Sequence, residues 1–288
     1  MDYGTNGGRR TKAGRATHSV ALLIPDIANP FYAELTRGTQ LQLTASGFTQ
    51  ILADTQESSA VEEQALQRVS KIADGVLLAA SRVSNKQLRA AAQACPIVLI
   101  NRVLEGFSSV WLDTGVGVEQ ALDHLISLGH RDVAYLSGPR SSWSDGLRWR
   151  ALRVAAKRKP VRLVKLGPFA PMIAAGPAAA DAAVGAGVTA CIAFNDLLAI
   201  GAMRRLKERG VHVPGELSLV GCDNVFGSDF CSPPLTTVAG DLQRLGRTAV
   251  QLLLAKVEDP NRTDEVVALP THLQIRRSTS AFEPPADA

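Results

Sequence analysis

The sequence lacks the features of a secreted or membrane-bound protein. It has no stretch of about 18 uninterrupted apolar residues, and no apolar segment precedes its first predicted strand. Its four cysteines include no C-x-x-C pair and lie mostly in apolar runs, which is typical of buried free thiols in a reducing compartment: Cys95, Cys191, Cys222 and Cys231. We therefore expect a soluble, cytoplasmic protein.

The sequence also lacks the motifs of common enzymes. It contains no P-loop and no G-x-S-x-G elbow, and its five histidines are scattered, with no i, i+4 pair and no neighbouring cysteine pair. The segment from Gly185 to Ala190 has the letters of a nucleotide-binding fingerprint, but it precedes a predicted strand, so we interpret it as a helix-to-strand turn. His130 follows a helix-ending glycine and is expected to be a capping or surface residue. We expect no catalytic residues, no metal and no cofactor.

Little net charge is present outside the N-terminus. The whole chain carries +4, and residues 1–17 contribute +3 of it through Arg9, Arg10, Lys12 and Arg15 against Asp2. The remaining residues therefore carry only +1. Clustered charge attracts nucleic acid far more strongly than dispersed charge. This basic arm is therefore interpreted either as a remnant of a DNA-contacting segment or as a disordered basic stub left by truncation or a misplaced start.

What the chain does contain is a regular alternation of short aliphatic runs and longer segments of helical period. This pattern predicts βαβ units and parallel sheets buried on both faces. Predicted strands are residues 20–25, 49–53, 75–78, 97–100, 109–112, 133–137, 161–165, 190–194 and 217–222. They are too many for one ordinary sheet, and 288 residues suffice for two lobes.

Helix signals support the alternation. Asn29 before Pro30 predicts an N-cap, residues 59–62 can form a capping box, and Gly129 ends a helix. The Ala-rich segment 174–190 is expected to be one helix. A last helix over residues 242–255 is followed by strand-like pieces at 266–269 and 273–276, so the chain is expected to cross both lobes again.

Several motifs occur in an order that resembles the LacI/GalR family of transcriptional repressors. They lie at residues 20–32 (VALLIPDIANPFY), 128–139 (LGHRDVAYLSGP), 193–202 (AFNDLLAIGA), 218–224 (SLVGCDN) and 233–238 (PPLTTV). The resemblance covers about residues 17–280. It implies a periplasmic-binding-protein-like (type I) α/β fold with two doubly wound parallel-sheet lobes, three crossovers and a ligand between the lobes.

This fold divides the chain as follows. Residues 1–17 are a basic arm, residues 18–112 and 241–268 form the N-terminal lobe, residues 113–240 and 269–280 form the C-terminal lobe, and residues 281–288 form a flexible tail. Open parallel sheets bind ligands at the carboxyl ends of their strands, which places the site between the lobes.

The resemblance implies nine effector-binding residues, each at or beyond a strand end: Phe31, Asn101, Arg102, Ser142, Ser144, Arg148, Phe169, Asn195 and Asp223. Arg148 matches the family's effector-binding arginine, whose planar fork of donors suits vicinal hydroxyls or a carboxylate. Three of these residues have plainer alternatives: Phe31 as a core residue, Arg148 as a surface arginine and Asn195 as a helix cap. The family commonly has an acidic residue where this chain has Asn101.

The resemblance also implies partners. We expect a ligand-responsive, allosteric regulator, a homodimer that binds a sugar, sugar phosphate or nucleobase-like effector and contacts operator DNA through a helix-turn-helix head absent from this sequence. Tyr3 and Asn6 resemble the end of that head, and residues 9–17 occupy the place of its linker. Lys12 stands where the family has a leucine that wedges between base steps. The alternatives are a transport-type sugar-binding protein of the same fold and an α/β enzyme.

Overall fold

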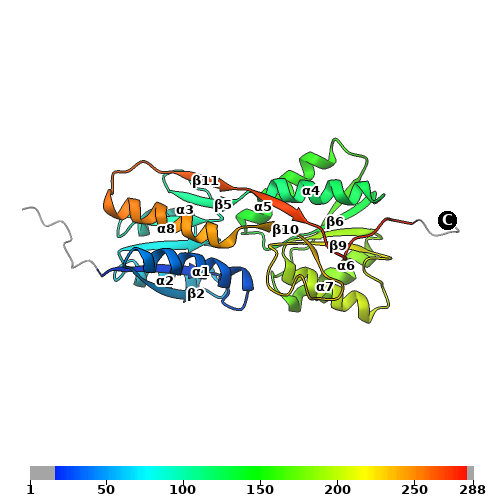
Figure 1. The fold of residues 1–288 in the computed structure, drawn as a ribbon, viewed down its shortest axis with the longest axis horizontal. Helices are drawn as coiled ribbons and strands as arrows, with labels where there is room; N and C mark the ends of the chain where they lie inside the picture. The colour runs from blue at the N-terminus through cyan, green and yellow to red at the C-terminus, as the bar shows by residue number, and fades with distance from the viewer. Residues whose placement is uncertain (1–16, 284–288) are drawn as a thin grey trace, which may run out of the picture.

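The structure, a computed structural model, describes residues 17–283 and shows two α/β lobes side by side (Figure 1). The predicted linker residues Arg9, Arg10, Lys12 and Arg15 lie outside the described residues, as do residues 284–288 of the predicted tail. Among residues 17–283, no helix combines the length and apolar character needed to cross a membrane.

Each lobe is built on a six-stranded sheet, and the two sheets share one topology. In the first sheet the order is β11-β5-β4-β3-β1-β2, and in the second it is β12-β10-β9-β8-β6-β7. The strands are β1 Ser19–Ile24, β2 Thr49–Asp54, β3 Gly75–Ala79, β4 Ile97–Ile100, β5 Ser109–Leu112, β6 Asp132–Leu136, β7 Arg162–Leu166, β8 Ala190–Ala193, β9 Ser218–Cys222, β10 Thr236–Gly240, β11 Val266–Leu269 and β12 Thr271–Gln274. All pairs are parallel except β10 with β12.

The helices cover both faces of each sheet. They are α1 Pro30–Ala45, α2 Ser59–Val69, α3 Asn85–Ala91, α4 Thr114–Ser127, α5 Trp143–Ala156, α6 Gly176–Gly185, α7 Asp196–Glu208 and α8 Leu242–Glu258, with a short 3-10 helix at Ile173–Ala175. The chain passes between the sheets three times, from β5 to α4, from β10 to α8 and from β11 to β12. In Figure 1 the last crossing is the orange-to-red strand pair that runs from one lobe to the other. The predicted fold class is confirmed.

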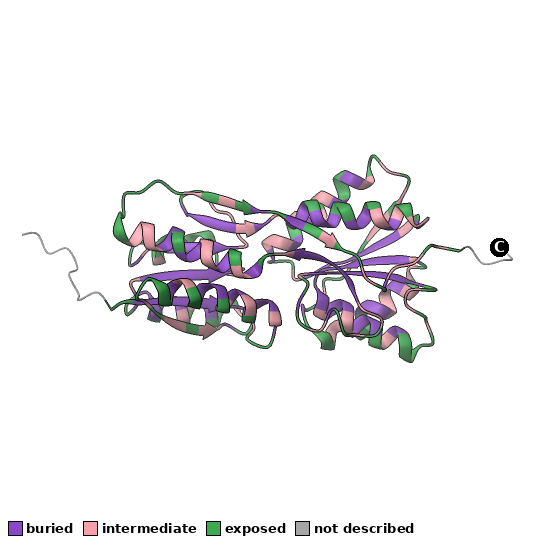
Figure 2. Cartoon of the chain, viewed as in Figure 1, coloured by how far each residue is buried: buried purple, intermediate pink, exposed green. Residues whose placement is uncertain are grey.

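Strand periodicity creates the cores. In β1, Val20, Leu22 and Ile24 face α1 and α8, whereas Ala21 and Leu23 face the opposite layer with α2 and α3. The second sheet is sandwiched in the same way, and Figure 2 shows the central strands of both lobes as buried. A strand buried on both faces reads as a continuous apolar run, which is why most strands could be predicted from the sequence.

Four local predictions need correction. Strand β10 was not predicted, because Thr236-Thr237-Val238-Ala239-Gly240 offers a single β-branched apolar residue. Strand β12 begins two residues earlier than expected, since only Pro270 separates it from β11. The Ala-rich segment forms a shorter helix, α6, and the cap of α2 is Ser58, whose Oγ accepts from the Val61 backbone N–H.

His130 is also not a surface residue. Its imidazole is buried, with Nδ1 2.9 Å from Thr189 Oγ1 and Nε2 2.9 Å from Ser218 Oγ. Burial lowers its pKa. It therefore ties the start of β6 to β8 and β9 as a neutral ring. Phe282 N donates to Leu128 O nearby, so the described part of the tail is anchored to the same lobe.

Helices α1 and α8 approach each other through glycine. A Cβ at Gly246 would lie 2.6 Å from Leu35 O and 2.8 Å from Thr39 N, both in the backbone of α1. We expect Gly246→Ala to lower the free energy of unfolding by about 1–3 kcal/mol, because the helices must separate. Chemical denaturation measures this. The control is Gly146→Ala, at an exposed helical glycine with nothing within 4 Å, which should stabilise slightly; equal effects would contradict the close packing.

Candidate functional site

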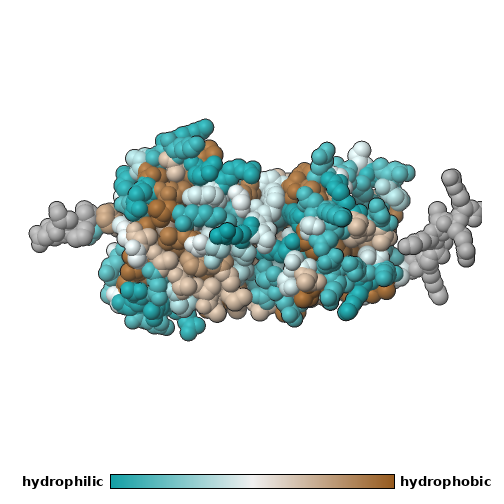
Figure 3. All heavy atoms as spheres, turned by 180° about the vertical axis from the view of Figure 1, so that it is seen from behind, coloured by the Kyte–Doolittle hydropathy of each residue, from teal (hydrophilic) through white to brown (hydrophobic). Residues whose placement is uncertain are grey.

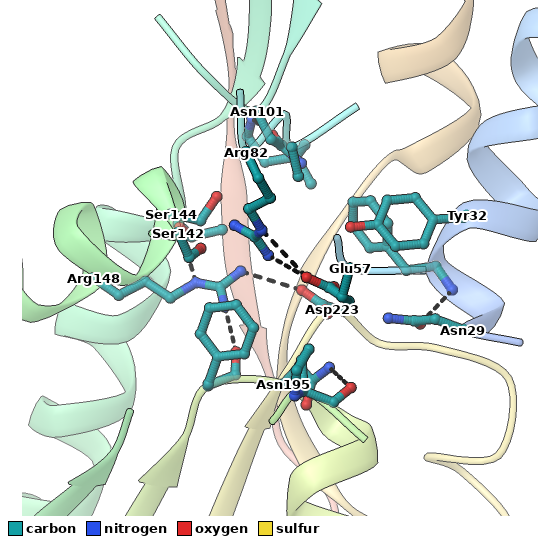
Figure 4. A pocket seen from close by; sticks show the side chains of 16 residues that line it. Asn29, Tyr32, Glu57, Arg82, Asn101, Ser142, Ser144, Arg148, Asn195 and Asp223 are labelled. Carbon is teal, nitrogen blue, oxygen red and sulfur yellow. Dashed lines mark hydrogen bonds and ion pairs between the residues drawn. The ribbon is translucent and has the colours of Figure 1, made fainter. Parts of the chain in front are cut away.

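The candidate site is a cavity between the lobes with a volume of only about 40 Å³ in this structure. Small-molecule sites commonly enclose about 300–1,000 Å³, so the walls of this cavity must move apart to admit a ligand. Its lining comes almost entirely from segments that follow the carboxyl ends of parallel strands, from β1 to β9 (Figure 4). The lining residues are Asn29, Phe31, Tyr32, Glu57, Ala80, Arg82, Asn101, Leu112, Thr114, Ser142, Ser144, Arg148, Pro171, Phe194, Asn195 and Asp223.

Arg148 dominates the side of the cavity formed by the second lobe. It projects from α5, and its guanidinium donates to Thr114 Oγ1 at 3.2 Å, to Phe194 O and to Asp223 Oδ1 at 3.2 Å. Its Cζ lies 4.9 Å from the centroid of the Phe194 ring. These contacts fix the plane of the guanidinium and leave some of its five N–H donors for a ligand. The alternative of an exposed surface arginine is therefore wrong.

Asp223 completes this ion pair from an unusual backbone position. Its φ is +112°, and its backbone N–H donates to Val238 O at 2.8 Å. Burial raises the pKa of Asp223 to about 6, while Arg148 and the Cys222 thiol act to lower it. At neutral pH the carboxylate is therefore mostly ionised and pairs with Arg148.

A second buried carboxyl, Asp196, lies beneath this loop. It accepts hydrogen bonds from Thr237 Oγ1 at 2.5 Å and from Val225 N at 2.9 Å, so it joins α7 to β10 and to the loop after β9. Burial, with Asp223 adding, raises its pKa to about 8. Gly221 is required beside it, because a Cβ there would lie 2.1 Å from Asp196 Oδ1.

The first lobe contributes another ion pair. Arg82 Nη2 lies 2.9 Å from Glu57 Oε2, and Arg82 Nε lies 3.2 Å from the same oxygen. The Arg82 side chain is only 7% exposed. Both residues sit in the turns after β2 and β3, and the backbone there is shaped by positive φ angles at Glu57 and Ala80. An ion pair from each lobe therefore faces the same cavity (Figure 4).

The comparisons with known proteins agree with this architecture. A model of the periplasmic binding protein-like domain matches residues 122–279. The HTH-type transcriptional regulator GalR of Escherichia coli is 30% identical over 269 residues, covering 90% of this chain and 78% of that protein. The HTH-type transcriptional regulator DegA of Bacillus subtilis is 29% identical, and the match covers 97% of this chain and 86% of that protein. The chain belongs to the LacI/GalR family of transcriptional regulators.

Solved structures of this family have the same fold. A LacI family regulator of Enterococcus faecium with bound ribose superposes with a TM-score of 0.81 at 29% identity, covering 92% of this chain and 100% of that one. The CelR–cellobiose complex superposes with a TM-score of 0.83 at 27% identity, and the match covers 92% of this chain and 85% of that one. The family identification places this chain among transcriptional regulators that respond to effectors.

Seven of the nine residues that the family resemblance implied line the cavity: Phe31, Asn101, Ser142, Ser144, Arg148, Asn195 and Asp223. Several of them also hold the backbone. Asn195 Oδ1 accepts from Leu198 N, which caps α7, and its Nδ2 donates to Pro171 O. Asn101 Oδ1 accepts from Leu112 N, leaving its amide N–H groups for other partners. Asn195 therefore caps α7, as its alternative interpretation proposed, and it also lines the cavity.

Arg102 and Phe169 do not line the cavity, which corrects two residues of the predicted set. The Arg102 guanidinium turns toward the neighbouring loop between β3 and α3 and donates to Ser81 O, Val83 O and Asn85 Oδ1. The chain after β7 turns at Gly167 (φ +113°), which packs Phe169 against the core under α6 and α7 and leaves Pro171 on the cavity wall.

The first-lobe ion pair of Glu57 and Arg82, and Tyr32, were not predicted from the sequence. Their position was the available signal: Glu57 and Arg82 follow predicted strands in the same way as Asn101. Strand ends alone do not show which side chain in a loop turns inward, and charged loop residues are usually solvated. Only the fold distinguishes Arg82, which turns into the cavity, from Arg102, which does not.

Proposed function

We propose that this chain is a ligand-responsive repressor whose effector is a sugar bound in the interlobe cavity. The observation that carries the proposal is that both lobes present hydrogen-bonding groups and aromatic rings to one cavity. Hydroxyl groups match the donors of Arg148 and Asn101 and the hydroxyls of Ser142 and Ser144, while Phe31 and Phe194 offer apolar faces. Relatives with bound ribose and cellobiose support this class.

The proposed mechanism is a change in lobe orientation. A ligand that contacts both lobes favours the arrangement in which both walls can reach it, and only such a difference in affinity shifts a conformational equilibrium. Trp111 of β5 and Trp143 of α5 meet edge to face across the lobes, with ring centroids 5.3 Å apart. This contact lies beside Ser142 and Ser144, so effector binding and lobe packing are coupled in one region.

The operator and the dimer are part of the same proposal. We expect two copies to pair, as in the dimeric lac repressor bound to its operator, and to act in the cytoplasm by binding rather than by catalysis. Large apolar side chains exposed on the surface include Phe226 and Phe230 after β9, whose rings lie 5.0 Å apart. Figure 3 shows one face of both lobes, on which the hydrophobic areas are separated from one another by hydrophilic side chains.

Thermal unfolding in the presence of single sugars tests the effector class. D-ribose, D-galactose, D-glucose and cellobiose are the first probes. A sugar at ~100 times its Kd should add about 2.7 kcal/mol of stability. A clear rise in Tm with at least one of them is the expected result. Unchanged unfolding with all four, at concentrations up to tens of millimolar, would contradict the proposed effector class.

A further inference from the structure

The ion pair of the first lobe is held in place before any ligand arrives. The buried Glu62 carboxylate accepts from Arg82 N at 2.7 Å, and Arg102 donates to the carbonyls of Ser81 and Val83 on either side. Arg82 is therefore fixed through its own backbone and through both neighbouring residues. A group fixed in this way loses little conformational entropy on binding, which suits a recognition element.

Tyr32 stands between the two ion pairs. Its side chain is buried, and Figure 4 shows its hydroxyl pointing toward Glu57 and Asp223. Within residues 17–283 that hydroxyl has no hydrogen-bond partner, and its oxygen is not among the enclosed polar atoms, so it opens into the cavity that Tyr32 lines. Burial, followed by the Glu57 charge, raises the pKa of Tyr32, so the hydroxyl stays protonated. A hydroxyl that opens into the cavity can donate a hydrogen bond to a ligand group and accept one from it.

The charges around the cavity already balance. Arg82 is paired with Glu57 and Arg148 with Asp223, so neither guanidinium is left with an uncompensated charge. Each pair still has unused donors and acceptors, because Glu57 Oε1 has no bond among the described residues and Arg82 Nη1 is also free there. Such mixed donor–acceptor edges match hydroxyl groups. An anionic ligand would instead meet two carboxylates.

From these observations we infer that Tyr32, Glu57 and Arg82 form the specificity-determining cluster of the first lobe, which reads hydroxyl groups of an uncharged sugar and disfavours its acidic or phosphorylated counterparts. The inference rests on the proposed function and assigns a role to residues that the resemblance did not include. Glu57 supplies the acceptor, Arg82 the donors and Tyr32 both. Arg148 and Asp223 hold the opposite side of the ligand.

The test compares the wild-type chain with Tyr32→Phe and Glu57→Gln, using Glu105→Gln as the control at an exposed glutamate of the same lobe. Isothermal titration measures Kd for D-galactose, D-glucose, D-ribose and cellobiose, and for D-galacturonate, D-glucuronate and D-ribose 5-phosphate. Glutamine still accepts a hydrogen bond from Arg82, and the Tm of each ligand-free variant checks its folding.

The wild type should bind a neutral sugar and prefer it to its charged counterpart. Tyr32→Phe and Glu57→Gln should each raise the Kd for the neutral sugar roughly tenfold, and the control variant should leave it unchanged. Glu57→Gln should also tighten binding of the uronate, because Arg82 loses its counterion. A general folding defect would instead weaken the binding of both the neutral sugar and the uronate.

Two results would overturn the inference alone: a neutral sugar that all four proteins bind equally, or a wild type that prefers a uronate or a phosphate. If none of the seven probes binds the wild type, the proposed function fails, and the inference falls with it.

Discussion

Replacing Arg148 with methionine should lower the free energy of unfolding by about 3–5 kcal/mol and abolish sugar binding. The loss has two sources. Asp223 keeps its buried position without a counterion, and the Phe194 carbonyl loses a charged donor. Because protonation removes the unpaired charge of the buried Asp223 carboxylate, the destabilisation should be smaller at pH 5 than at pH 8. Guanidinium unfolding at both pH values measures it.

Two companion variants separate stability from binding. Arg150→Met changes an exposed arginine on the same helix and should alter stability by less than about 0.5 kcal/mol. The double variant Arg148→Met, Asp223→Asn removes both charges, so it should regain much of the lost stability while remaining unable to bind the sugar. If Arg148→Met were as stable as Arg150→Met, Arg148 would not be the buried anchor described above.

Replacing Asp196 with asparagine should flatten the dependence of stability on pH. A carboxyl whose pKa is raised by folding, here from 3.8 to about 8, binds its proton more tightly in the folded state. Its stabilising contribution is complete below the unfolded pKa and is lost as the pH rises toward 8, at up to about 1.4 kcal/mol per pH unit. Asparagine carries no such charge and can still bond Val225 N and Thr237 Oγ1.

The measurement is the free energy of unfolding at pH 5, 6, 7 and 8 for the wild type and Asp196→Asn. The wild type should lose stability over this range more steeply than the variant. Asp223, with its pKa raised to about 6, contributes in the same direction in both proteins. Asp181→Asn is the control, because Arg205 and Arg209 lower the pKa of that exposed carboxyl. Parallel curves for the wild type and Asp196→Asn would contradict the assignment.

The fold could be predicted from the sequence where buried strands appear as continuous apolar runs. Strands such as β1 and β3 are covered on both faces, so their residues are apolar except for Ser19 at the start of β1. Gly129 was correctly predicted to end α4, and its φ of +93° explains why glycine stands there. Strand β10 has no such apolar run, because its threonines serve as hydrogen-bond partners. Thr237 donates to Asp196, and Thr236 N donates to Ser278 Oγ.

The site was predictable only in part, for a physical reason. Arg148 and Asp223 occupy positions fixed by strand ends and were identified through the family resemblance. Glu57 and Arg82 depend on the turns after β2 and β3, where positive φ angles direct the chain, and periodicity says nothing about such turns. Arg102 shows the converse: it follows a strand end but satisfies the carbonyls of a neighbouring loop instead of the cavity.

We propose that the cavity between the lobes is the effector site of this LacI/GalR family regulator. The most direct test is calorimetric titration of the wild type and of the Arg148→Met, Asp223→Asn double variant with the sugar that gives the largest rise in Tm. We expect saturable binding to the wild type and none to the double variant, although both are folded. Equal Kd values for the two proteins would show that the effector binds elsewhere than in this cavity.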